Sequence, residues 1–142
     1  MKVFISGSIK IRTLPQAAKE KLNNIINKNL TVLVGDANGI DKEVQNYLNS
    51  FNYRNVIVYY AGNNLRNNLG QWETYNVPSL GKVGREMYTL KDIQMALDSD
   101  YGLMIWDGQS KGTKKNIDEM LNQGKHFYVI QNNHLLSYKN FI

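Results

Sequence analysis

The chain has 142 residues, of which 42% are hydrophobic and 20% are charged, and its net charge is +5. This length fits a single domain, and this composition supports a hydrophobic core rather than a disordered tail. Cysteine is absent, which excludes disulfides, thiolate metal sites and a cysteine nucleophile. Only two histidines are present, His126 and His134, so we expect no metal site. We also expect no cofactor.

The first residues begin a strand directly and lack the parts of a signal peptide, and no apolar run approaches the roughly 20 residues that span a bilayer. We therefore expect a cytoplasmic protein with no membrane partner. The positive charge favours anionic partners such as nucleotides, nucleic acid or acidic lipid. Because Lys and Arg are dispersed along the chain, an ordinary solvated surface is the simpler interpretation of that charge.

Five short apolar runs predict five strands, and their continuous apolar cores are typical of strands buried on both faces of a parallel sheet. Thr13 is expected to cap the first helix, and Gly124 to end the last one. The alternation of strands and helices predicts one Rossmann-like α/β domain, residues 1–142, with a doubly wound, parallel five-stranded sheet. The expected elements are strands at 3–6, 31–34, 55–60, 102–106 and 127–130, and helices after 13, after 39, at 85–97 and at 113–123.

Residues 61–84 form a long connection with no clear period, and such loops in compact domains are usually functional or disordered. Because it contains Arg66, Trp72 and Tyr75, we interpret it as a lid over the site or part of an interface; a plain surface loop is the alternative. The tail, residues 132–142, fits either a short strand or an extended arm.

Ligands of an open parallel sheet bind outside the carboxyl ends of its strands. After the first strand, Gly7 allows close backbone approach and Ser8 can donate a hydrogen bond, although a tight turn explains this glycine equally well. After the second strand, the loop amides and the next helix N-terminus can form an anion or sugar site. Two aspartates there can accept from ribose hydroxyls, or the second can simply stabilise the helix. The ligand residues expected in this loop are Gly35, Asp36, Ala37, Asn38, Gly39 and Asp41.

The segment at 106–113 resembles a phosphate cradle, because glycines, hydroxyls and a lysine precede a helix N-terminus. It lacks the spacing of a Walker A motif. The alternative is a well-capped loop with Thr113 as the helix N-cap. The ligand residues expected here are Asp107, Gly108, Ser110, Lys111, Gly112 and Thr113.

Three stretches together resemble the SLOG superfamily: Gly-Asp-Ala-Asn-Gly-Ile-Asp-Lys at 35–42, Lys-Asp-x-x-Met-Ala-x-x-Ser-Asp at 91–100, and Leu-Met-Ile-Trp at 103–106 followed by Ser-Lys-Gly-Thr. The superfamily includes the cytokinin-activating phosphoribohydrolases, the DNA-processing protein A domain and ligand-sensing domains of anti-phage systems. It is similar to the nucleoside deoxyribosyltransferases and deoxynucleotide N-glycosidases. The resemblance covers residues 1–131 and implies a Rossmann-like fold and a nucleotide-type ligand.

One departure from the phosphoribohydrolases bears on activity. Their Gly-Gly-x-Gly-Thr-x-x-Glu stretch places a catalytic carboxylate where this chain has Asn116, and the deoxyribosyltransferase-like enzymes have a nucleophilic Glu nearby. An amide serves neither as a base nor as a carboxylate nucleophile. Their arginine on the preceding helix is matched by Lys91, which keeps the charge but loses the bidentate fork. The resemblance therefore implies a cradle that is retained without its catalytic group.

The phosphoribohydrolases are dimers or larger and complete their sites across an interface, so the resemblance implies a homodimer or larger assembly here. Arg85, Tyr88 and Lys91 follow one another at i, i+3 and i+6 on one helix and can contribute to such a site. An ordinary solvated helix face is the alternative.

Three functions are consistent with these features. The first is binding, without turnover, of a nucleotide-derived small molecule (an NAD- or ADP-ribose-type or cyclic-nucleotide signal), as a sensor or a sequestering sponge in phage defence or counter-defence. The second is cleavage of the base–ribose bond of a nucleotide, with Asp107 or Asp36 as the catalytic carboxylate. The third is nucleic-acid binding, which the pI of about 9.3 permits although no aromatic platform with interleaved Lys and Arg is evident. We expect the first.

Overall fold

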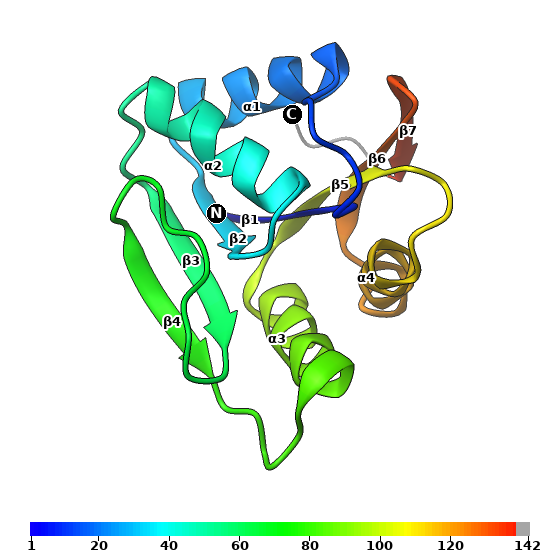
Figure 1. The fold of residues 1–142 in the computed structure, drawn as a ribbon. Coiled ribbons are helices and arrows are strands. Elements are labelled where there is room, and N and C mark those ends of the chain that lie inside the picture. The colour runs from blue at the N-terminus through cyan, green and yellow to red at the C-terminus, as the bar shows by residue number, and fades with distance from the viewer. Residues whose placement is uncertain (139–142) are drawn as a thin grey trace.

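The computed structural model describes residues 1–138, and in them it shows an α/β fold with four helices and a single sheet of seven strands (Figure 1). The strands are ordered β4-β3-β2-β1-β5-β6-β7 across the sheet, and all neighbours pair in parallel except β6 and β7. The elements in chain order are β1 (Lys2–Gly7), α1 (Gln16–Asn27), β2 (Thr31–Gly35), α2 (Ile40–Ser50), β3 (Val56–Ala61), β4 (Glu73–Val77), α3 (Gly84–Asp98), β5 (Tyr101–Trp106), α4 (Lys111–Asn122), β6 (His126–Gln131) and β7 (His134–Tyr138).

The predicted α/β class is confirmed and is consistent with a Rossmann-like fold, but the predicted number of five strands is wrong. β4 lies inside the connection that shows no period, because this edge strand exposes all its side chains except that of Val77. β7 lies in the tail and forms a hairpin with β6. Its two-residue turn, Asn132 and Asn133, has positive φ at both positions (50° and 64°), as a type I′ hairpin turn requires. Residues 139–142 of the predicted tail lie outside the described residues.

Helices cover both faces of the sheet: α1 and α2 one face, α3 and α4 the other (Figure 1). Successive strand residues point to opposite faces, so Val3 and Ile5 of β1 pack with the first pair of helices while Phe4 packs with the second. This two-sided burial explains the continuous apolar runs. None of the helices in residues 1–138 combines the length and apolar character needed to cross a membrane.

Two helices start differently from the prediction. α1 begins at Gln16 after Pro15, so Thr13 is not its N-cap. α4 begins at Lys111 with Ser110 at the N-cap, which places Thr113 inside its first turn. Gly124 follows α4 in a left-handed conformation, with φ of 67°, as predicted.

The chain order places a crevice beside β1. From β1 the chain leaves toward β2, and it returns on the other side of β1 as β5. The loops that follow β1 and β5 therefore diverge to opposite faces of the sheet. Such switch points form ligand crevices at the carboxyl ends of strands.

Candidate functional site

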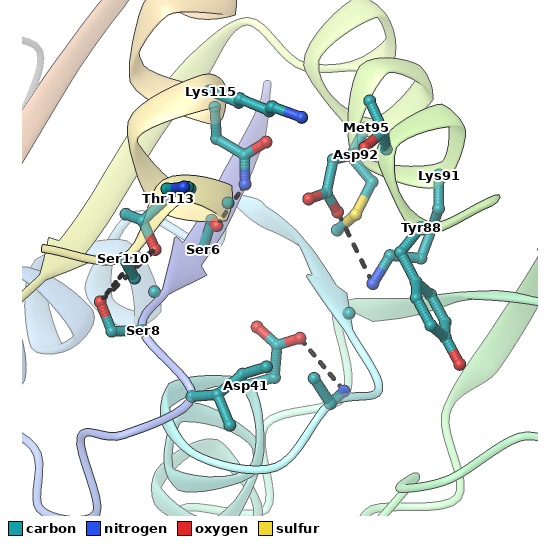
Figure 2. Close-up of a pocket in the computed structure, with 18 of the residues that line it drawn as sticks. Ser6, Ser8, Asp41, Tyr88, Lys91, Asp92, Met95, Ser110, Thr113 and Lys115 are labelled. Carbon is teal, nitrogen blue, oxygen red and sulfur yellow. Dashed lines mark hydrogen bonds and ion pairs between the residues drawn. The ribbon is translucent and has the colours of Figure 1, made fainter. Parts of the chain in front are cut away.

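A cavity of about 870 Å³ opens at the carboxyl ends of β1, β2 and β5. Its walls come from β1 and the loops after these strands, from one face of α3 between Gly84 and Met95, and from the first two turns of α4 (Figure 2). The structure thus brings together segments that are far apart in the sequence. The predicted site residues that line this cavity are Gly7, Ser8, Gly35, Ala37, Asp41, Arg66, Arg85, Lys91, Asp107, Ser110, Lys111, Gly112, Thr113 and Asn116.

Three hydroxyls form a cluster at the α4 end of the cavity. The Ser8 and Ser110 Oγ atoms are 2.8 Å apart, and Ser110 Oγ donates to Thr113 Oγ1 at 3.0 Å. Figure 2 shows these side chains together at one side of the pocket. The amides of the first turn of α4 have no acceptors within the helix. This end therefore combines hydroxyls, first-turn amides and the positive end of the helix dipole, which suits an anion.

Asp107 organises the loop before α4. Its Oδ1 accepts the backbone N–H groups of Gln109 and Ser110, both at 2.8 Å. These two bonds favour the charged form and lower the pKa of this carboxyl below its ordinary value. A carboxylate held ionised in this way is a poor general acid, but the ionised form is the one that acts as a base or a nucleophile.

Asn116 is buried in the cavity wall and donates from Nδ2 to Ser6 Oγ at 2.7 Å. Its amide is therefore engaged with the end of β1. In this contact the serine hydroxyl is the acceptor. An ionised carboxylate at position 116 has no proton to donate, so it could not make the same hydrogen bond. The local hydrogen bonding matches an amide here.

A buried charge cluster forms the opposite wall. The side chains of Asp41 and Lys91 both pack against Gly35. A Cβ at this position would lie 2.5 Å from Asp41 Oδ2 and 2.7 Å from Lys91 Nζ, so glycine leaves the room that they need. Lys91 Nζ also lies 3.6 Å from Asp92 and 4.0 Å from Asp36. Burial opposes the charge on Lys91, but the surrounding carboxylates outweigh it and raise its pKa.

Burial has the opposite outcome at Asp41. It raises the pKa of this carboxyl to about 6, against the lowering effect of Lys91 and of the Ala37 N–H, which donates to Oδ2 at 3.2 Å. Asp41 thus lies in the cavity with a pKa close to neutral pH. It is the carboxylate best matched to proton transfer in this site.

Arg66 reaches the cavity from the segment after β3. Its backbone N–H and its guanidinium both bond the carboxylate of Asp36, at 2.9 and 2.6 Å. The guanidinium also stacks over the ring of Tyr88, 4.5 Å from its centre. Asp36 itself is buried and does not line the cavity, so it positions Arg66 rather than reaching a ribose.

The predicted lid is in large part an anchored segment. Gln45 donates to the carbonyls of Gly35 and Asn67 and accepts the N–H of Leu69. Trp72 is buried in the core on the α1/α2 side and donates its indole N–H to the Tyr53 carbonyl at 2.8 Å. The structure therefore places Trp72 in the core, because an indole buries a large apolar area.

Tyr75 is likewise away from the cavity. Its ring stacks on Tyr59 across the β3–β4 pair, 5.1 Å between centres. Asn38, Gly39 and Gly108 also do not line the cavity. Of the three residues that the sequence analysis assigns to the lid, only Arg66 lines the cavity.

Several lining residues have no assigned role in the sequence-based prediction. Asp92 follows Tyr88 at i+4 on α3, and Lys115 follows Lys111 at i+4 on α4. Residues four apart lie on the same face of a helix, so this spacing was the signal in the sequence that Asp92 and Lys115 also face the cavity. Arg85, Tyr88 and Lys91 all line this same cavity. The further lining residues are Phe4, Ile5, Ser6, Ile9, Lys10, Gly84, Thr89, Met95 and Gln109.

Among residues 1–138 no group of three His, Cys, Asp or Glu side chains is arranged to hold a metal ion. Comparison with protein-family models gives no match, and comparison with curated proteins gives none either. The chemistry of the site is therefore interpreted from its own geometry.

Proposed function

We propose that the protein binds a nucleotide-derived anion in this cavity and retains it without turnover. The observation that carries the proposal is the α4 end of the cavity, where an open first turn and three hydroxyls stand beside an amide, Asn116, hydrogen-bonded to the end of β1. Helix N-termini bind phosphate in this way. The nucleotide character of the ligand rests on the resemblance to the SLOG superfamily.

Exposed cations at the cavity mouth support an anionic ligand. Their charges attract anions and raise the rate of encounter. The rim cations are Lys10, Arg85, Lys111 and Lys115. The role that we propose is sequestration or sensing of a signalling nucleotide, and assembly into a homodimer stays a prediction.

A second candidate function, cleavage of the base–ribose bond, is favoured by one observation. Asp41 lines the cavity with a pKa of about 6, so near neutral pH it can give or take a proton. Asp36 is less suited because it does not line the cavity, and Asp107 is less suited as a general acid because its hydrogen bonds lower its pKa. If the protein is an enzyme, we propose Asp41 as its general acid or base.

The substitution Gly112→Val tests the binding proposal. Gly112 lines the cavity, and a Cβ there meets nothing within 4 Å in the protein, so we expect the added side chain to take up space that the ligand needs. We expect AMP or ADP-ribose affinity to fall at least tenfold, as steric loss of a charged contact predicts. Isothermal titration calorimetry measures this, with circular dichroism to verify the fold.

Leu121→Val is the control, because it places valine on an exposed face of the same helix away from the cavity. Unchanged affinity in Gly112→Val would exclude the α4 turn as the anion site. Free base released from AMP or NAD by the wild type, and lost in Asp41→Asn, would establish the second candidate instead. Intact ligand after incubation supports retention.

A further inference from the structure

The charges around the cavity are divided between its mouth and its inner wall. The cations of the mouth and of the first turn of α4 are exposed to solvent. The inner wall, between α2 and α3, is lined by two carboxylates, Asp41 and Asp92, and by two cations, Arg66 and Lys91. A third carboxylate, Asp36, is buried behind this wall, where it is bonded to Arg66. With all five groups ionised, the wall and the Asp36 carboxylate behind it together carry one excess negative charge.

The two inner cations are already engaged by these carboxylates. Arg66 is held by Asp36 through two hydrogen bonds, and Lys91 lies among Asp36, Asp92 and Asp41. A second phosphate on the ligand would have to compete with these fixed partners. By contrast, the Asp41 carboxylate accepts a hydrogen bond from the Ala37 N–H, and an ionised carboxylate has about four acceptor positions.

Figure 2 shows how the two regions face the same space. Ser8, Ser110 and Thr113 lie at one side of the pocket, Lys91 and Asp92 at the other, and Asp41 lies between and below them. A ligand with its anion at the hydroxyl cluster therefore directs its remaining part toward Asp41 and Asp92. Acceptor groups at that wall favour hydrogen-bond donors and disfavour another anion.

We propose that Asp41, together with Asp92, selects a ligand that is anionic at one end only and presents hydrogen-bond donors, such as free ribose hydroxyls, at the other. The inference rests on the proposed function and specifies its ligand class: a nucleoside 5′-monophosphate is accepted, and a nucleotide with a second phosphate on the ribose is rejected. The rejection comes from placing like charges together at this wall.

The test compares AMP with adenosine 3′,5′-bisphosphate by isothermal titration calorimetry at pH 7.5. We expect the wild type to bind AMP at least tenfold more tightly. In Asp41→Asn the excess charge is removed and an acceptor oxygen is kept, so the ratio of the two dissociation constants should fall to threefold or less. The control, Glu43→Gln, removes the same charge from the same helix outside the cavity and should keep the wild-type ratio.

Changing pH gives an independent arm. The charged groups around Asp41 are Asp36 from its own loop, Lys91 and Asp92 from α3, and Arg66 from the segment after β3. Because burial raises the pKa of Asp41 to about 6, its carboxyl is protonated at pH 5. At pH 5 the wild-type ratio of the two dissociation constants should then approach the ratio of Asp41→Asn. Because the phosphate groups of the ligands also titrate near pH 6, Asp41→Asn is measured at each pH as the reference.

The outcomes separate the two proposals. AMP binding with equal affinity for the bisphosphate, or an unchanged ratio in Asp41→Asn, would overturn the selection by Asp41 and leave the binding function standing. If neither nucleotide binds the wild type, the proposed function is wrong and the inference falls with it. A ratio that also collapses in Glu43→Gln would show a general charge effect and overturn the assignment to Asp41.

Discussion

Glycine residues of the site differ in what their missing side chain allows. Gly39 has a left-handed backbone conformation, with a φ of 76°, and it packs against the backbone of Ile9. A Cβ at Gly39 would lie 2.3 Å from the Ile9 carbonyl oxygen. Gly35 makes room for the Asp41 and Lys91 side chains, which are ends of side chains and can move. Gly112 faces open space. Gly35 and Gly112 line the cavity and Gly39 does not, although the sequence pattern treats all three alike.

These surroundings predict different costs of substitution. Gly39→Ala should lower the free energy of unfolding by about 3 kcal/mol, because it adds left-handed strain to a clash with the backbone. Gly112→Ala should change it by less than about 0.5 kcal/mol, because a surface substitution without new contacts is nearly neutral. Urea unfolding followed by circular dichroism measures both. Equal losses in the two variants would contradict the assigned roles.

At the scale of elements, the segment between β3 and β4 is the clearest case of a loop that the tertiary structure makes rigid. Gln45 of α2, the carboxylate of Asp36 and the buried indole of Trp72 all hold it. Asn68 adds a local clamp, since its side chain bonds both the N–H and the carbonyl of Trp72. The segment therefore presents Arg66 to the cavity as a fixed group rather than as part of a moving lid.

A pair of alanine variants tests this interpretation. Trp72→Ala should lower the free energy of unfolding by about 3–5 kcal/mol, as for a core aromatic. Tyr75→Ala should cost about 1 kcal/mol, the contribution of one stacked pair at an exposed edge. Chemical denaturation provides both values. If Trp72→Ala instead weakened AMP binding without loss of stability, Trp72 would belong to a lid after all.

At the scale of the whole molecule, the buried carboxyl of Asp41 makes stability depend on pH. Its pKa is about 6 in the folded protein against the ordinary 3.8, so the folded state binds the proton more tightly than the unfolded state. This group therefore favours folding when protonated. Its contribution is complete below about pH 4 and is lost as the pH rises through about 6.

The magnitude follows from the shift. The free energy of unfolding of the wild type, minus that of Asp41→Asn, should fall by up to about 3 kcal/mol between pH 4 and pH 8. Taking the difference removes the titration of groups that both proteins share. Thermal or urea unfolding at several pH values measures it. A flat difference would show that Asp41 is not buried with a raised pKa.

Much of this architecture was predictable from local sequence. The continuous runs at Val3–Ile5 and Leu103–Ile105 predicted buried parallel strands, and glycine-rich loops after them predicted a site at their carboxyl ends. β4 has no such apolar run, because nearly all its side chains are exposed. For the hairpin of β6 and β7, the only signal in the sequence is the pair of adjacent asparagines that forms its turn. The strand number therefore depended on elements without a hydrophobic pattern.

The sequence by itself determined the α/β class, the loops that line the cavity and the amide at position 116, because these follow from periodicity, turn chemistry and residue type. The tertiary structure decided which residues face the ligand. It placed Trp72 in the core, directed Asp36 toward Arg66, and brought Asp41, Lys91 and Asp92 into one buried cluster. Burial and charge proximity set the pKa of Asp41, and both arise only when α2 and α3 pack around the end of β2.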